Sequence, residues 1–207
     1  PIVLETENRG QKTAVWKITE SKEELLLLVR LTPEEEKNLE SLTNENRKKE
    51  WLAVRVLLQQ LRPSCPVIKY KQNGKPYLTD GSEEISISHS GPYIAIALSK
   101  RSLPGIDIEQ INPRIKKIAE RFVNKQENAF LKENTLLEQL CIIWCAKEVL
   151  YTIHPEGMLN FKNHLIIPAF TLADSGEMDG LIIKDGTRAE HILAYRQIEN
   201  YMLVYSI

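Results

Sequence analysis

Cysteine is scarce in this 207-residue sequence, which contains only Cys65, Cys141 and Cys145. None of them lies in a Cys-x-x-Cys pair, and an odd number of cysteines does not make a closed disulfide framework. The count argues against a small disulfide-stabilised extracellular protein and fits reduced thiols. We therefore predict a cytoplasmic protein.

Net charge, long apolar runs and a leader segment are also lacking. The chain has 27 basic and 28 acidic residues, for a formal net charge of -1, so no overall positive field favours nucleic acid or an anionic membrane. The longest apolar runs, such as Leu25–Val29 and Ile94–Leu98, are far shorter than the ~20 residues that span a bilayer. Residues 1–5 show neither the basic nor the apolar region of a signal peptide. We expect a soluble protein with no nucleic-acid and no membrane partner.

What the sequence does contain is an internal repeat. The segments Trp51–Leu58 and Trp144–Tyr151 share a tryptophan, an alanine, a valine and a leucine at a constant offset of 93 residues. Capping-box starts precede both, at Thr32–Glu35 and Asn124–Glu127. We predict an α+β fold of two similar α+β halves, residues 1–100 and 101–207, related by a pseudo-twofold axis. The predicted strands include 14–18, 85–88 and 93–98 in the first half and 107–111, 191–195 and 201–207 in the second.

Two acids, Asp107 and Glu109, alternate with Ile106 and Ile108 in a strand-like segment. Residues two apart on a strand share a face, so the carboxylates point one way and the isoleucines point into a core. Adjacent carboxylates repel each other unless a cation lies between them, and Mg²⁺ is held by one or two carboxylates, water and phosphate oxygens. Glu148 can supply a third acid. The pattern predicts phosphoryl chemistry, and its alternative is an edge strand with two solvated acids.

Positive groups collect in the first half instead. In the overlay of the two halves, Ala14 and Trp16 replace the two acids, and Arg55 replaces Glu148. If the halves pack face to face, an acidic metal site meets a basic phosphate-binding wall in the cleft between them, where small-molecule sites prefer to lie. The positive groups of the first half are Arg47, Lys48, Lys49, Arg55, Lys75 and His89. Of these, Lys48 and Lys49 belong to a basic run on a helix, which we assign to the solvated face.

Four motifs follow one another along the chain: Asn73–Pro76, Ile87–Gly91, Gly105–Glu109 and Trp144–Glu148. Their order and spacing resemble the 4'-phosphopantetheinyl transferases of the long, pseudo-dimeric, surfactin-synthetase-activating type, over most of residues 47–170. The resemblance implies the fold of that family. It also implies an enzyme that moves the phosphopantetheine arm of coenzyme A onto a serine of an acyl or peptidyl carrier protein. It further implies that Mg²⁺ is the cofactor and that adenosine 3',5'-bisphosphate is the product released.

The resemblance implies definite roles for the acidic segment. Asp107, Glu109 and Glu148 would hold Mg²⁺ against the coenzyme A pyrophosphate, which makes Asp107 a contact to coenzyme A as well. Lys147 and Glu148 would be the catalytic residues, with Glu148 the general base for the carrier serine, directly or through water. Without the resemblance, Lys147 and Glu148 read as an ordinary solvated pair on a helix.

The same resemblance implies basic and hydroxyl contacts to coenzyme A. The guanidinium forks of Arg47 and Arg55 suit the adenosine phosphates. Ser88 and the imidazole of His89 would donate hydrogen bonds to phosphate, and Lys75 would project from a rigid Asn-Gly turn. The alternatives are a structural histidine at a strand end and a solvated turn lysine.

One position departs from the family pattern. The family commonly has a lysine one helical turn after the motif glutamate, and this sequence has Thr152 there. The cation that would lie beside Glu148 is therefore missing, and His154 or Lys162 could replace it. The alternative function is a weakened relative that binds coenzyme A or a carrier protein without efficient transfer. A generic metal phosphohydrolase is a third reading, because it explains the acids but not the basic half.

Residues 112–130 are the candidate surface for the carrier protein, with apolar anchors at Ile115, Ile118, Phe122 and Val123. The alternative is that these four residues pack the second core. A chain that already contains both halves needs no partner chain to complete the cleft. We therefore expect a monomer.

Overall fold

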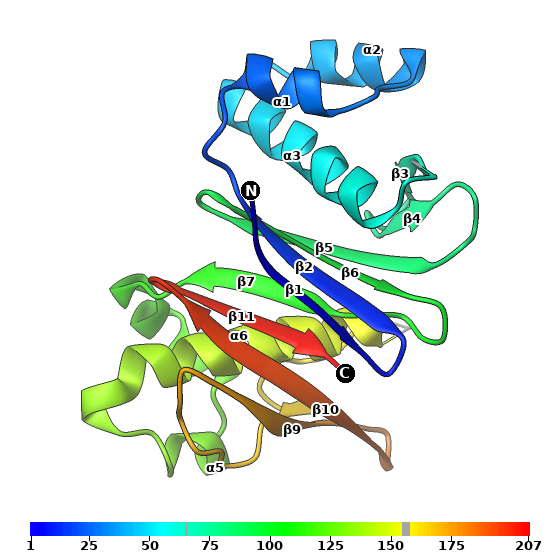
Figure 1. Cartoon of the computed structure of the whole chain (residues 1–207). Coiled ribbons are helices and arrows are strands. Elements are labelled where there is room, and N and C mark those ends of the chain that lie inside the picture. Colours follow the sequence, from blue (N-terminus) through cyan, green and yellow to red (C-terminus); the bar gives the residue numbers. More distant parts are fainter. Residues whose placement is uncertain (65, 155–157) are drawn as a thin grey trace. The chain divides into compact units, whose positions relative to one another are not determined.

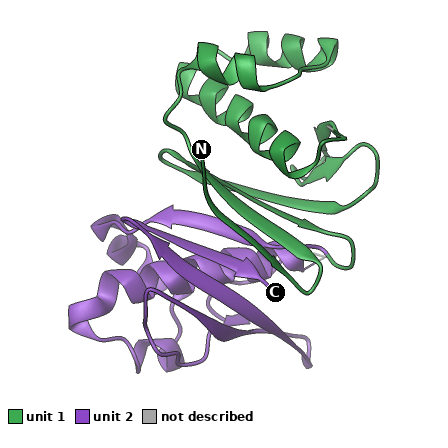
Figure 2. Cartoon of the chain, viewed as in Figure 1, with its two compact units in different colours: residues 1–102 green, residues 103–207 purple. Residues whose placement is uncertain are grey.

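The computed structural model describes residues 1–64, 66–154 and 158–207, so Cys65 lies outside the described residues. The chain forms two compact units, Pro1–Ser102 and Leu103–Ile207 (Figure 2). The boundary predicted from the sequence lies between residues 100 and 101. Each unit contains helices and an antiparallel sheet, in agreement with the predicted α+β class.

Unit 1 contains a four-stranded antiparallel sheet in the order β1-β2-β6-β5. The long helix α3 packs on this sheet, and α1 packs against α3 (Figure 1). A separate hairpin, β3–β4, follows α3. The elements are β1 (Ile2–Asn8), β2 (Gln11–Lys17), α1 (Lys22–Leu28), α2 (Pro33–Ser41), α3 (Glu45–Leu61), β3 (Ile68–Tyr70), β4 (Pro76–Leu78), β5 (Glu84–Ser90) and β6 (Tyr93–Ser99).

The core of unit 1 lies between α3 and the sheet. The side chain of Asn44 caps α3 by accepting a hydrogen bond from the backbone N–H of Arg47, as expected for an N-cap residue. Leu52, Val56 and Leu57 on the inner face of α3 have no exposed surface. They pack in one cluster with residues of the sheet, which include Trp16, Ile85, Ile94, Ile96 and Leu98.

Unit 2 contains a five-stranded antiparallel sheet in the order β7-β11-β10-β9-β8, and the long helix α6 packs on it. Several short helical turns connect β7 to α6 (Figure 1). The elements are β7 (Ile106–Gln110), the 3-10 turn η1 (Pro113–Lys117), α4 (Ala119–Phe122), α5 (Lys125–Asn128), η2 (Glu133–Thr135), α6 (Leu136–Ile153), β8 (Leu165–Ile166), β9 (Ser175–Lys184), β10 (Thr187–Ile198) and β11 (Tyr201–Ser206).

The two units share one strand connectivity. In unit 1 the last strand, β6, lies between β2 and β5. In unit 2 the last strand, β11, lies in the same way between β7 and β10. Unit 1 adds β1 beside β2, whereas unit 2 adds β9 and β8 beyond β10. The repeated segments occupy equivalent places on α3 and α6, where Ala53 and Ala146 are both fully buried. The pseudo-twofold relation between the halves stays a prediction.

Both predicted capping boxes are confirmed. Thr32 caps α2 and Asn124 caps α5, each with reciprocal hydrogen bonds to the glutamate three residues later. The six strands predicted from alternating residues correspond to β2, β5, β6, β7, β10 and β11. The sequence analysis did not identify β1, β3, β4, β8 and β9. Three of these five are only two or three residues long, and such short strands carry little periodic signal.

Candidate active site

The two acids of β7 lie on the face of the unit 2 sheet that packs against α6. In the antiparallel register, Asp107 pairs with Val204 of β11 and Glu109 pairs with Met202. Directly opposite residues share a face, and Val204 and Met202 belong to the hydrophobic cluster around α6. Asp107 is therefore buried beneath the helix, with 9% of its surface exposed, whereas Glu109 is half-buried.

The isoleucines that alternate with these acids, Ile106 and Ile108, are buried as predicted. By the same alternation they lie on the opposite face of the sheet from Asp107 and Glu109. The simple picture of apolar residues facing the helix and acids facing away is thus reversed on β7. Here the helix covers carboxylates, which is an arrangement that chain packing alone does not favour.

Helix α6 brings a third carboxylate toward this face. Burial raises the pKa of Glu148 above its ordinary value of 4.5, and the negative charge of Glu109 raises it further. Asp107 lies near Cys145 of α6, about one helical turn before Glu148. Burial raises the pKa of the Cys145 thiol, and the neighbouring Cys141 and Asp107 raise that pKa further. Glu109 therefore lies within charge-interaction range of Glu148, and Asp107 lies within that range of Cys145.

This donor set fits Mg²⁺ in its chemistry. The ion prefers oxygen ligands and keeps several waters, so it needs only one or two carboxylates from the protein. A cation between Glu109 and Glu148 would relieve the repulsion that raises the pKa of Glu148. Within the described ranges, no three His, Cys, Asp or Glu side chains form a preassembled metal cluster. The three-carboxylate site therefore stays a prediction.

Lys147, the predicted catalytic neighbour of Glu148, points into the core of unit 2 and has no exposed surface. Its ammonium donates to Glu127 at 2.8 Å and to the backbone carbonyls of Phe122 at 2.6 Å and Phe161 at 2.9 Å. Burial lowers the pKa of Lys147, and the charge of Glu127 opposes this shift. In this conformation Lys147 connects α6 to two other segments instead of facing the acids.

Glu127, which the sequence analysis noted only as part of a capping box, completes this buried pair. Besides the ammonium of Lys147, its carboxylate accepts the backbone N–H groups of Asn124 at 2.8 Å and Ile167 at 2.9 Å. An acid buried to this extent needs such partners, because an unpaired buried charge is strongly unfavourable. The capping box was the local signal for this residue, but nothing local indicated that Lys147 is its partner.

Arg55 forms a similar buried ion pair in unit 1, although the overlay aligns it with Glu148 and not with Lys147. Its Nε donates to the carboxylate of Glu35 at 2.9 Å, Nη1 donates to the carbonyl of Trp51 at 3.2 Å, and the guanidinium lies 3.1 Å from the centre of the Trp51 ring. Only 4% of Arg55 is exposed. In both units, a capping-box glutamate therefore pairs with a buried cation of the long helix. The predicted contact of Arg55 to coenzyme A would require breaking this pair.

Two of the predicted phosphate ligands in unit 1 do meet. Arg47, in the first turn of α3, places Nη1 3.2 Å from Nε2 of His89, which lies near the end of β5. Both residues are exposed to solvent. Glu50, which the sequence analysis did not single out, lies beside them: its carboxylate is 3.4 Å from Arg47 and 3.8 Å from Nδ1 of His89.

The remaining unit 1 candidates lie on strands and turns. Ser88 is half-buried on β5, next to His89. Lys75 closes the β3–β4 hairpin, where its carbonyl accepts the N–H of Lys71 and its N–H donates to the side chain of Asn73. Gly74 has a φ of +81°, a left-handed conformation that glycine adopts readily. The Asn-Gly turn is thus confirmed, and it holds the backbone of Lys75 in place.

The position that departs from the family pattern, Thr152, is half-buried in the last turn of α6. His154 is the C-cap residue of the same helix. Lys162 donates from Nζ to the backbone carbonyl of Glu120 at 3.0 Å. Lys162 is thus directed toward the α4 segment, and its role as a substitute cation stays a prediction.

The candidate carrier surface, residues 112–130, contributes mainly to the core. Ile115, Phe122 and Val123 are buried in the cluster around α6, and Ile118 packs against it. Phe122 also contacts Trp144 edge-on, with ring centres 5.2 Å apart. The structure therefore supports core packing for these four residues, which was the alternative reading.

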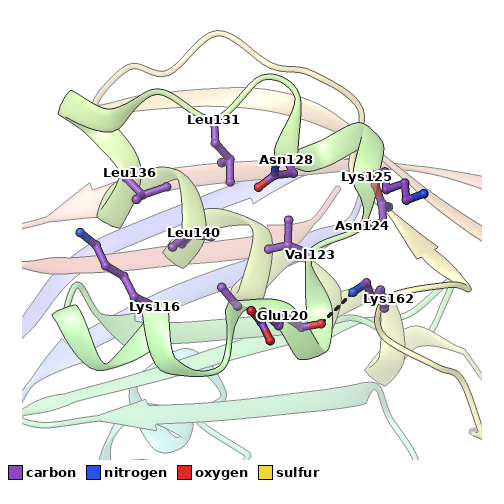
Figure 3. Close-up of a pocket in the computed structure, with 11 residues that line it drawn as sticks. Lys116, Glu120, Val123, Asn124, Lys125, Asn128, Leu131, Leu136, Leu140 and Lys162 are labelled. Carbon is purple, nitrogen blue, oxygen red and sulfur yellow. Dashed lines mark hydrogen bonds between the residues drawn. The ribbon is translucent and has the colours of Figure 1, made fainter.

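A pocket nevertheless opens over the same segment, with a volume of about 430 Å³. Figure 3 shows aliphatic side chains gathered between lysines that lie at its two sides. The lining residues are Lys116, Ala119, Glu120, Val123, Asn124, Lys125, Asn128, Leu131, Leu136, Leu140 and Lys162.

Comparisons with known proteins point to the same segment as the acids. The model of the family described as the 4'-phosphopantetheinyl transferase superfamily matches residues 104–192, which contain Asp107, Glu109 and Glu148.

Among the described residues, none of the helices has the length and apolar character that a membrane span requires.

Curated relatives carry the same family name. The chain is 35% identical over 101 residues to the 4'-phosphopantetheinyl transferase AcpT of Salmonella typhimurium, covering 47% of this chain and 53% of that protein. It is 34% identical over 110 residues to AcpT of Escherichia coli (strain K12), covering 50% and 56%. It is 32% identical over 114 residues to the 4'-phosphopantetheinyl transferase gsp of Aneurinibacillus migulanus, covering 53% and 47%. The chain thus spans about half the length of the curated relatives it matches. Residues 104–192 are thus similar to the 4'-phosphopantetheinyl transferase superfamily, both by the family model and by these relatives.

Proposed function

We propose that this protein transfers 4'-phosphopantetheine from coenzyme A to a serine of an acyl or peptidyl carrier protein, in a Mg²⁺-dependent reaction that releases adenosine 3',5'-bisphosphate. One observation carries the proposal. Glu148 of α6 lies close enough to Glu109 of β7 for the two charges to interact, and Asp107 lies on the same face. All three acids lie inside the segment that matches the superfamily.

The acids have separate tasks in this reaction. Asp107 and Glu109 would hold Mg²⁺ together with Glu148, and the ion, when bound, would neutralise charge on the pyrophosphate of coenzyme A. Glu148 would also accept the proton of the carrier serine. It would accept this proton directly or through a bound water. The serine oxygen then bonds to phosphorus, and the bond from phosphorus to adenosine 3',5'-bisphosphate breaks.

Unit 1 would supply the contacts to the coenzyme A phosphates. Arg47 and His89 already lie together on an exposed surface, and we assign them, with Lys75 and Ser88, to this task. An arginine donates to phosphate through a planar fork, and a neutral or charged imidazole can add one further donor. Residues 1–102 would thus bind coenzyme A, and residues 103–207 would hold the metal and the base.

Lys147 and Arg55 take different roles in this proposal from those that the sequence suggested. Both are buried in ion pairs, with Glu127 and Glu35 respectively. We assign them to holding the long helices in place, because moving either cation to a substrate would leave a buried carboxylate without its ion partner. Lys147 would then act on catalysis only through the position of its neighbour Glu148.

We also propose that the protein is of the long, pseudo-dimeric type and acts as a cytoplasmic monomer. The shared connectivity of the two units supports this, since one chain then carries both sets of residues. The alternative, a relative that binds coenzyme A or a carrier protein without efficient transfer, is favoured by one observation. Thr152 provides no charge at the position where the family has a lysine.

Mass spectrometry separates these possibilities. The protein is incubated with an apo carrier protein, coenzyme A and Mg²⁺, and we expect the carrier to gain the mass of one phosphopantetheine arm. The controls are a carrier whose acceptor serine is changed to alanine and a reaction with chelator. Coenzyme A binding without a mass gain on acyl, peptidyl or aryl carriers would favour the alternative. No binding and no mass gain would contradict both.

A further inference from the structure

The contact between Arg47 and His89 has a polarity that the chemistry of the two groups determines. An arginine N–H can only donate, so Nε2 of His89 must accept in the 3.2 Å contact with Nη1. The imidazole proton then lies on Nδ1, the nitrogen 3.8 Å from the carboxylate of Glu50. In this arrangement the arginine points a donor at the imidazole.

Glu50 is placed where an anionic ligand of the pair would be attracted. Its Oε2 lies 3.4 Å from Nη1 of Arg47 and 3.8 Å from Nδ1 of His89. The side chain of Glu50 is 22% exposed, compared with 62% for Arg47 and 41% for His89. The carboxylate thus lies at the inner side of the pair, while both cation-forming groups remain open to solvent.

We propose that Glu50 is an internal competitor for the phosphate-binding pair Arg47–His89 and lowers its affinity for phosphate monoesters. A phosphate dianion that contacts Arg47 comes close to the negative charge of Glu50, which contacts the same guanidinium. The two negative charges repel each other. The carboxylate therefore opposes phosphate binding whether or not it keeps its contact with Nη1 of Arg47. This inference rests on the proposed function, because coenzyme A is the ligand that it concerns.

The test is the affinity of coenzyme A for Glu50→Gln, measured by titration calorimetry without carrier protein. Glutamine keeps the size and helix propensity of the side chain but removes the charge. An exposed ion pair contributes roughly 0.3–1 kcal/mol, so the Kd of coenzyme A should fall roughly two- to five-fold. The matched control is Glu45→Gln on the same helix. Glu45 is exposed and pairs with Lys22 and Lys48 instead, and its removal should leave the Kd unchanged.

A second variant keeps the test specific. If Glu50 acts through Arg47, Glu50→Gln should give no gain in an Arg47→Ala background. The inference is overturned if Glu50→Gln binds coenzyme A as tightly as the wild type or more weakly, or if its gain persists without Arg47. Failure of the proposed function looks different: the wild-type protein itself would then show no binding of coenzyme A, which would remove the basis of the inference as well.

Discussion

Replacing Lys147 by methionine tests the buried ion pair of unit 2. Methionine fills a similar volume but removes the ammonium, which donates three hydrogen bonds in a site with no exposed surface. Glu127 then keeps its hydrogen bonds from the backbone of Asn124 and Ile167 but loses its counter-charge. We expect a large loss of stability, because a buried carboxylate without a cation is strongly unfavourable.

The magnitude follows from the burial of both partners. Both side chains of the pair are 0% exposed, and removing one partner of such a pair typically costs about 3–5 kcal/mol. Because the backbone N–H groups of Asn124 and Ile167 still donate to Glu127, we expect a loss near the lower end of this range, at about 3 kcal/mol. This is a substantial part of the 5–15 kcal/mol that is usual for a folded domain. The exposed pair of Lys48 with Glu45 is the matched control, and Lys48→Met should leave the free energy of unfolding nearly unchanged, because exposed ion pairs contribute little to stability.

Urea unfolding measures both variants, and the buried thiols of unit 2 report on that unit directly. Cys141 and Cys145 have no exposed surface, so their rate of labelling by a thiol reagent increases only when unit 2 opens. The double variant Lys147→Met with Glu127→Gln should be more stable than Lys147→Met alone, because it removes the unpaired charge. A loss below about 1 kcal/mol for Lys147→Met, or no gain from the second substitution, would refute the reasoning.

Three further predictions concern the acids and the helix that carries Glu148. Glu148→Gln should raise the stability of the fold at neutral pH and have no effect well below pH 4.5. The folded pKa of Glu148 is raised, so the wild-type protein loses stability as the pH rises from 4.5 through that pKa. Thermal unfolding over this pH range measures the effect, and a destabilised variant at pH 7 would contradict the sign. Asp107→Ala should abolish transfer at saturating Mg²⁺ while thermal stability stays level or rises; near-full activity in the carrier assay would remove Asp107 from the metal site. Thr152→Lys should raise turnover with a carrier protein by placing an ammonium one turn after Glu148. Equal turnover, with no loss in Lys162→Ala, would show that the missing cation is not needed.

Local features of the fold were predictable because the interactions that produce them are short in sequence. A capping box joins residues three apart, as in Thr32 with Glu35 and Asn124 with Glu127. The Asn73-Gly74 turn needs one left-handed residue, and alternation along β7 needs only the geometry of an extended strand. Side-chain type and spacing therefore predicted where these elements begin and which residues of β7 share a face.

The pairing of charges was decided by tertiary packing. Glu35 with Arg55 and Glu127 with Lys147 are each 20 residues apart, and Arg47 meets His89 across 42 residues. Sequence spacing did not show that Arg55 and Lys147 point inward, because a cation on a helix reads as solvated until the opposite surface supplies a carboxylate.

The site divides in the same way. The sequence by itself predicted that Asp107, Glu109 and Glu148 form one acidic site, because the residue types and their order carry that expectation. Only the tertiary structure decided that the face bearing Asp107 and Glu109 is the one covered by α6, and that Glu148 rather than Lys147 turns toward it. The physical reason is the rotation of the helix against the sheet, which depends on the packing of both surfaces at once.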